Sequence, residues 1–232
     1  PFTRKGSFDF EKFAETVAVA TRLSDDLVEL ELEKLEHIRS IADQDDEKEL
    51  WASLYNACAN GRRTGLGTHG LADALACLGV AYDSDAALKI VDKIYETLKI
   101  GAYSESVELA KERGAFPVFE WNLEKDNGFI KRLPKSLRDN IKKYGRRNIA
   151  LLTNAPTGSV SILSQTSSGI EPVFRNSYIR RRKLSHNEGN VEPDFVDDLG
   201  DKWKEFEVFH HNISQYLDAK KSSTLPAYFV ES

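Results

Sequence analysis

The residue types that could do chemistry are concentrated in one short turn. The sequence reads NAPTGSVSI at residues 154–162, directly after the apolar run NIALLT at residues 148–153. This order predicts a buried strand, a turn of small residues and a short helix. Small residues let a backbone approach a ligand closely, and the first N–H groups of a helix have no partner within it. The turn is therefore typical of a phosphate site, although an ordinary capped turn explains the same residues.

Two other groups of residues could bind a ligand. Glu171 lies among apolar neighbours, as a functional buried carboxylate or a structural acceptor of backbone N–H groups would. The histidines His69, His210 and His211 lack a third ligand at zinc spacing, so we expect no metal site.

A run of cations, RRRK, occupies residues 180–183 of a segment that we expect to be extended over residues 177–184. Alternation along a strand places Arg180 and Arg182 on one face, and Arg181 and Lys183 on the other. One face could meet an acidic partner or the charge of a substrate. An edge strand that is protected by its charges has the same pattern.

A second glycine-rich segment, RTGLGTHG at residues 63–70, contains the spacing G-x-G-x-x-G. A dinucleotide-binding turn of this kind follows a hydrophobic strand, whereas a helix is predicted at residues 47–59, with Asn60 and Gly61 as its left-handed end. We therefore interpret these glycines as a turn packed closely against the next helix, at residues 71–78.

The elements that must position these turns are mainly helices. Apolar residues at a spacing of three and four predict a helix over residues 8–39, with Ser7 as its cap and a charged, solvated flank at residues 29–36. Its expected apolar face comprises Phe10, Phe13, Val17, Ala20, Leu23, Leu27 and Leu30. Further helices are predicted at residues 85–113 and 136–144.

Composition excludes several classes of protein. The 232 residues are 41% hydrophobic and 30% charged, which is typical of a folded globular chain. A net charge of −5 argues against general affinity for nucleic acid. Because there is no secretory leader and no membrane-length apolar run, we expect a soluble, cytoplasmic protein. The sequence holds no Met, which indicates a processed piece or a fragment of a longer chain.

Several separated motifs carry a family resemblance. The run NAPTGSVSI, the run TSSGIEPVF at residues 166–174 and the run YIRRR at residues 178–182 together resemble the large catalytic subunit of ribonucleotide reductases. The glycine turn, residues 103–116 and the terminal run LPAYFV at residues 225–230 resemble the same family. The sequence TSSGIEP most resembles that of the adenosylcobalamin-dependent class II enzymes.

The resemblance implies a fold and an activity. The fold is a helix-rich α/β segment of a ten-stranded α/β barrel, a single fragment in which residues 1–146 are mainly helical and residues 147–232 hold the turn and mixed strands. The parent would be a vitamin B12-dependent ribonucleoside-diphosphate reductase, converting ribonucleotides to 2′-deoxyribonucleotides by thiyl-radical chemistry. Its implied cofactor is adenosylcobalamin, and its partners are the ribonucleotide and a thioredoxin-like or other dithiol reductant. A homodimer of the parent is left open. The implied substrate phosphate site is Thr157, Gly158, Ser159, Val160 and Ser161.

The chain also departs from the family pattern. The finger loop with the radical cysteine precedes the first residue of this chain, so we expect no catalytic residue here and no activity of the fragment alone. Cys58 and Cys77 match no cysteine motif of the family, and we expect both to be buried structural thiols. The alternatives are the iron-dependent class I large subunit, a non-catalytic nucleotide-binding module and a helical interaction domain.

Overall fold

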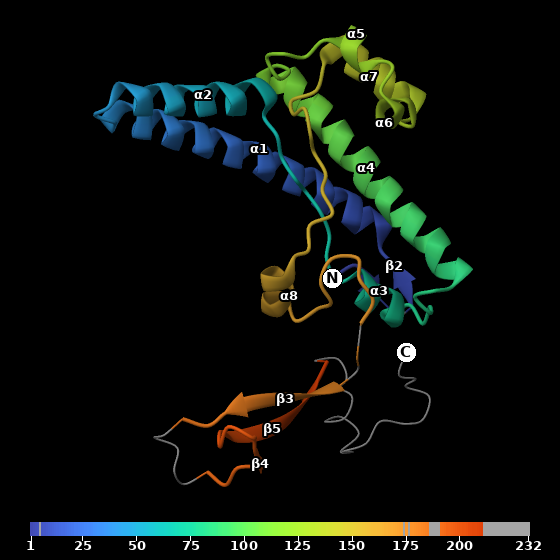
Figure 1. Ribbon diagram of the computed structural model, residues 1–232. Coiled ribbons are helices and arrows are strands. Elements are labelled where there is room, and N and C mark those ends of the chain that lie inside the picture. Colours follow the sequence, from blue (N-terminus) through green and yellow to red (C-terminus); the bar gives the residue numbers. More distant parts are fainter. Residues whose placement is uncertain (5, 174, 176, 186–190, 211–232) are drawn as a thin grey trace.

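The computed structural model describes residues 1–4, 6–173, 175, 177–185 and 191–210. Helices occupy most of residues 10–164, and short strands lie before and after them (Figure 1). In chain order the elements are β1 (Thr3–Arg4), β2 (Ser7–Phe8), α1 (Phe10–Ile41), α2 (Asp45–Gly61), α3 (Leu71–Cys77), α4 (Asp85–Arg113), α5 (Trp121–Glu124), α6 (Gly128–Lys131), α7 (Lys135–Tyr144), α8 (Gly158–Ser164), β3 (Ser177–Lys183), β4 (Phe195–Val196) and β5 (Lys202–Phe209).

The long helix α1 confirms the predicted helix, but its cap is a different residue. Ser7 lies in β2, and the carboxylate of Asp9 instead accepts the N–H of Lys12 at 3.0 Å. Asp9 is the residue directly before the first helical residue, from which an oxygen side chain reaches the free N–H groups of the first turn.

The buried face of α1 also differs from the predicted one beyond Val17. Leu23, Leu27 and Leu30 are exposed, at 59%, 56% and 59%. The face that packs against α4 and then α2 contains two polar residues, Thr21 and Asp25, which are completely buried. The apolar pattern was misleading because these polar residues pack in the interior through hydrogen bonds.

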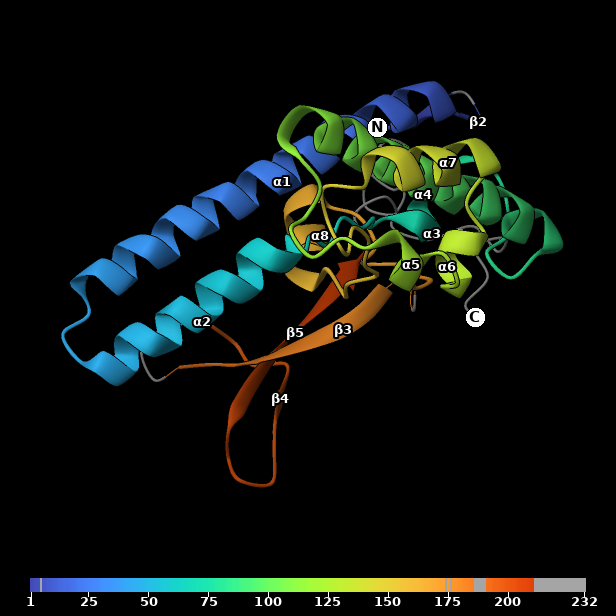
Figure 2. The same ribbon diagram turned by 90° about the horizontal axis from the view of Figure 1, so that it is seen from above.

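The helix α2 runs antiparallel to α1 and forms a projecting hairpin with it (Figures 1 and 2). The left-handed residue at its end is Arg62, with φ of 46°, rather than Asn60 or Gly61. The Arg62 N–H bonds to the Cys58 carbonyl at 2.8 Å, and its side chain is ion-paired to Asp25 at 2.8 Å. These interactions offset the cost of a left-handed arginine.

Two apolar clusters hold the helices together. The first joins the beginning of α1 to α3 and the first half of α4, and its buried members include Val17, Leu75 and Leu98. The second joins the second half of α4 to α7, with Ile141 and Leu151 as buried members. Leu152 packs against both clusters, so the segment at residues 149–154 lies along the face of α4.

The predicted strand at residues 148–153 is reduced to one parallel bridge, between Leu66 and Leu152. The Leu66 N–H bonds to the Leu151 carbonyl at 2.8 Å, and the Thr153 N–H bonds to the Leu66 carbonyl at 3.0 Å. The glycine turn is therefore packed against this extended segment rather than against the following helix. A β-carbon on Gly67 would lie 2.5 Å from the Thr153 carbonyl oxygen, which explains why a glycine is needed there.

A three-stranded antiparallel sheet, with strand order β3-β5-β4, projects away from the helices in both views (Figures 1 and 2). The predicted extended segment is confirmed as β3, and its register pairs Arg180 with Phe206 and Arg182 with Lys204. The terminal run LPAYFV, His211 and Phe174 lie outside the described residues. Among the helices that are described, none combines the length and the apolar character needed to cross a bilayer.

Candidate phosphate-binding site

The helix α8 begins in the turn that the sequence singled out. Its cap, Thr157, has φ of 38°, a left-handed conformation that is rare for a β-branched residue and is typical of strained functional turns. The next three residues, Gly158, Ser159 and Val160, are exposed. Their N–H groups form the free first turn of the helix, and none has an acceptor among the described residues. Three donors are thus open to solvent at one point.

Ser161 has a different role from the other members of the predicted site. Its side chain is buried and its hydroxyl donates to the Gly158 carbonyl at 2.7 Å, while its N–H donates to the Thr157 carbonyl at 2.9 Å. Ser161 therefore closes the turn from inside, and the exposed donors come from the three preceding residues.

The turn is tied to the loop that follows α8. The Thr157 hydroxyl accepts the N–H of Gly169 at 2.7 Å, across 12 residues of chain. Gly169 is buried, with φ of 47°, so its N–H depends on this acceptor. Sequence reasoning missed this link because a threonine in a turn carries no signal of its partner.

We predict that Thr157→Ala loosens this loop and Thr157→Ser does not. The alanine leaves the buried Gly169 N–H without an acceptor, which costs about 1–3 kcal/mol of unfolding free energy. Urea unfolding measures that cost, and hydrogen exchange at the Gly169 amide should become at least about tenfold faster. Equal exchange rates in the two variants would show that the hydroxyl does not hold the loop.

The far end of α8 is tied to the glycine turn by a cluster of polar side chains. His69 Nδ1 lies 2.9 Å from Thr166 Oγ1, which in turn lies 3.0 Å from Ser164 Oγ. Beside them, the Ser167 N–H donates to Asp73 Oδ2 at 2.7 Å. In the sequence, His69 was considered only as a metal ligand, and that role was rejected. No local pattern predicted its contact with Thr166, which lies 97 residues further along the chain. The glycine turn thus positions α8 and the turn from which it starts.

Two other sequence expectations are wrong. Glu171 is exposed rather than buried, because the chain leaves the helical body after Ile170, whose carbonyl accepts the Tyr82 hydroxyl. Cys77 is exposed at the last position of α3, and Cys58 is only partly buried. Burial and the nearby carboxylate of Glu31 raise the pKa of the Cys58 thiol, which disfavours the reactive thiolate.

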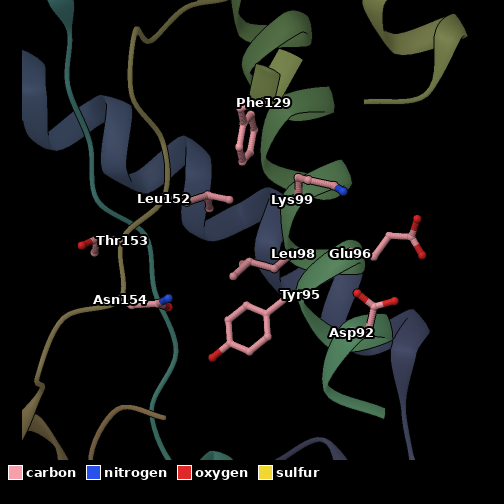
Figure 3. A pocket seen from close by; sticks show the side chains of 9 residues that line it. All are labelled: Asp92, Tyr95, Glu96, Leu98, Lys99, Phe129, Leu152, Thr153 and Asn154. Atoms are coloured by element: carbon pink, nitrogen blue, oxygen red, sulfur yellow. The ribbon is translucent and has the colours of Figure 1, made fainter. Parts of the chain in front are cut away.

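Two cavities flank the carboxyl end of residues 149–154, on the side of α4. Figure 3 shows Leu152 and Asn154 pointing toward α4 and Thr153 pointing away from it. The larger cavity, of about 360 Å³, has Tyr95 and Phe129 as its aromatic lining; the smaller, of about 300 Å³, shares Tyr95 and Asn154 with it. The Tyr95 hydroxyl is 2.8 Å from Thr68 Oγ1, and burial raises its pKa.

The described residues bring no three His, Cys, Asp or Glu side chains together as a metal ion would require. The start of α8 offers hydrogen bonding from backbone donors.

Comparison with known proteins assigns the chain to a family. The model of the family described as "Ribonucleotide reductase, barrel domain" matches residues 2–228. The vitamin B12-dependent ribonucleoside-diphosphate reductase of Mycobacterium tuberculosis (strain CDC 1551 / Oshkosh) is 31% identical over 175 residues, covering 75% of this chain and 21% of the relative. The ribonucleoside-diphosphate reductase large chain of Neurospora crassa is 30% identical over 206 residues, covering 83% of this chain and 20% of the relative.

A solved structure is also similar. The class Id ribonucleotide reductase alpha subunit of Actinobacillus ureae superposes with a TM-score of 0.51 at 27% identity, covering 70% of this chain and 25% of that chain. The chain spans about a fifth of the length of the curated relatives it matches. A family match over nearly every residue, together with these relatives, shows that the chain belongs to the ribonucleotide reductase barrel-domain family.

Proposed function

We propose that this chain is the part of a ribonucleotide reductase that holds the phosphates of its ribonucleotide substrate. The proposed site is the turn formed by Thr157, Gly158, Ser159, Val160 and Ser161. The observation that carries the proposal is the set of three exposed N–H groups at the start of α8, without acceptors among the described residues. The parent enzyme would convert ribonucleotides to 2′-deoxyribonucleotides.

The turn suits a phosphate for physical reasons. Hydrogen bonds to a charged group contribute about 1.5–3 kcal/mol each, and the helix dipole adds about 0.3–1 kcal/mol at an exposed N-terminus. Two or three such bonds account for useful affinity without a lysine. The ties at Thr157–Gly169 and His69–Thr166 keep the donors in place before the ligand arrives, which lowers the entropic cost of binding.

The relatives named as vitamin B12-dependent support adenosylcobalamin as the cofactor of the parent. When bound, it would supply the radical that starts the reaction. The two cavities beside α4, of about 360 and 300 Å³, do not fit this cofactor, because they are at the small end of pockets for drug-sized ligands and a corrinoid is much larger. We therefore assign no cobalamin contact to these two cavities.

Further proposals rest on family membership. The parent would accept electrons from a thioredoxin-like or other dithiol reductant, because reduction of the ribose needs two electrons. We also propose a cytoplasmic location, with a homodimer of the parent as the assembly to test.

A second candidate function has its own support. The structural neighbour is a class Id alpha subunit, and the Neurospora crassa relative is called a large chain. These names favour a parent that works with a second, radical-generating subunit. Deoxyribonucleotide formation by the parent with a dithiol reductant, with and without adenosylcobalamin, distinguishes the two candidates.

The phosphate site is tested by Gly158→Ala in the parent enzyme. A β-carbon at Gly158 meets no atom within 4 Å, and its φ is not positive, so the fold should accept alanine. A bound phosphate would lie against that β-carbon. We expect KM for the ribonucleotide to rise at least about tenfold, the equivalent of one weakened charged hydrogen bond, with the melting temperature unchanged.

Gly128→Ala is the matched control. Gly128 also begins a short helix, α6, and a β-carbon there likewise meets nothing within 4 Å. If both alanine variants keep the wild-type KM, the turn does not contact the substrate. Titration of the 232-residue chain with a nucleoside diphosphate gives a second readout, because the amide signals of Gly158 and Ser159 should shift.

A further inference from the structure

The sheet β3-β5-β4 has two faces of different chemistry. The antiparallel register places even-numbered residues of all three strands on one face and odd-numbered residues on the other. On the odd-numbered face, Arg181 pairs with Glu205 at 2.8 Å and lies over the ring of Phe195. Phe195 is itself stacked on Trp203, with 5° between the planes. The cations of that face are paired with carboxylates, since Lys183 also pairs with Asp201 at 2.5 Å.

The even-numbered face, here called the basic face, is different. It carries four cations and two aromatic rings, and no strand position on it is a carboxylate; its members are Tyr178, Arg180, Arg182, Val196, Lys202, Lys204, Phe206 and Val208. Lys204 is neutralised by Asp194, which lies just before β4, at 2.7 Å. Arg180 and Lys202 are exposed and have no ion-pair partner among the described residues.

The two exposed cations lie on the same face of the sheet but on different strands. Arg180 belongs to the outer strand β3 and Lys202 to the central strand β5, with Arg182 and Lys204 standing opposite each other between them. Protection of an edge strand would not require Lys202, in the central strand, to share a face with Arg180. An anionic ligand on the basic face would supply a counter-charge to both exposed cations.

We propose that the basic face binds an extended acidic peptide segment of a partner protein. Cations two residues apart along a strand are about 6.6–6.8 Å apart, the spacing of alternate side chains in an extended peptide. Tyr178, 51% exposed, lies beyond Arg180 at one end of the face, and Phe206, 43% exposed, lies directly opposite Arg180, so an apolar side chain should stand next to the acidic run. The chain's net charge of −5 favours a short peptide over a polynucleotide, which needs basic contacts over a longer track.

The test is fluorescence anisotropy with the 232-residue chain and a labelled peptide in which Glu and Asp residues precede Leu-Phe. The variant Arg180→Gln with Lys202→Gln removes two positive charges from the basic face. The control, Arg181→Gln with Lys183→Gln, removes two from the opposite face, where both side chains are more than half exposed. Circular dichroism verifies that both doubles keep the wild-type fold.

We expect the basic-face double to bind about tenfold more weakly, the control to bind within about threefold of wild type, and salt to weaken binding in all three. No binding by the wild type, or equal losses in the two doubles, would overturn the proposal. Tighter binding of an oligothymidine with the same number of charges would overturn it too, in favour of nucleic acid.

Discussion

Asp25→Asn is expected to lower the unfolding free energy of the chain by about 3–5 kcal/mol, because it removes a completely buried counter-charge that three arginines share. Asp25 is completely buried. Its Oδ1 accepts from Arg62 at 2.8 Å, and its Oδ2 accepts from Arg113 at 3.1 Å and Arg147 at 3.3 Å. One buried carboxylate thus contacts three guanidinium groups. An amide would leave them the half-exposed carboxylates of Glu29 and Asp26 as counter-charges.

Asp26→Asn is the matched control, since Asp26 is 54% exposed and, within the described part of the chain, its ion pair is with Arg113 alone, at 2.6 Å. An exposed pair of this kind contributes about 0–1 kcal/mol. Urea unfolding of both variants gives the comparison. Equal losses in the two would show that the buried cluster does not depend on Asp25.

The sign of the pH dependence follows from the same carboxyl. Burial alone raises the pKa of Asp25, but the hydrogen bond and charge of Arg62, with the charge of Arg147, lower it by more, so the folded-state pKa lies below the ordinary value. The stability that Asp25 contributes is therefore fully present above about pH 4 and is lost as the pH falls through the lower folded-state pKa. The difference between wild type and Asp25→Asn should shrink over that acidic range.

Gly67→Ala is expected to destabilise the chain by about 1–3 kcal/mol and to disturb the turn at the start of α8. Its β-carbon would meet the Thr153 carbonyl oxygen at 2.5 Å, a backbone atom that can give way only if the segment moves. That movement would break the bond between the Thr153 N–H and the Leu66 carbonyl, and Thr153 lies four residues before Thr157. Amide chemical shifts from Thr153 to Ser159 would report the displacement.

Gly65→Ala provides a graded control on the same turn. Its β-carbon would meet only side-chain atoms of Thr153, with the methyl group nearest at 3.2 Å, and a small side-chain rotation relieves that contact. We expect a smaller loss of stability and little change at Ser159. If Gly65→Ala is as damaging as Gly67→Ala, backbone contact is not the cause.

Much of the fold could be predicted from local patterns. The spacing of apolar residues predicted α4 and its end at Gly114, and the alternation at residues 177–184 predicted β3. The buried face of α1 could not be predicted, because leucines at Leu23, Leu27 and Leu30 had the helical spacing while the interior held Asp25. In the sequence alone, a carboxylate that will be buried cannot be distinguished from a solvated one. The arginines that pair with Asp25 lie 37 to 122 residues away, so no local pattern reveals them.

The candidate site shows the same limit. The small residues Gly158 and Ser159 predicted a turn at the start of a helix. Several separated motifs, in the order in which the family has them, indicated the family. The residues that hold the turn in place were not visible, because Gly169 and His69 act through side-chain contacts across 12 and 97 residues of chain. The local sequence therefore indicates which backbone N–H groups are exposed at the start of α8. The side chains that hold this turn in place are brought to it only by the folded chain.

The buried carboxylate of α1 also constrains the order of events during synthesis. Asp25 leaves the ribosome in the first helix, but Arg147 and Asn148, which bond to it, are 122 and 123 residues further along. Contacts of such high sequence separation carry a large loop-closure cost and slow the search for the native state. The helical hairpin α1–α2 can pair Asp25 with Arg62 early, but the remaining bonds of this carboxylate form only after residues 147 and 148 have been translated.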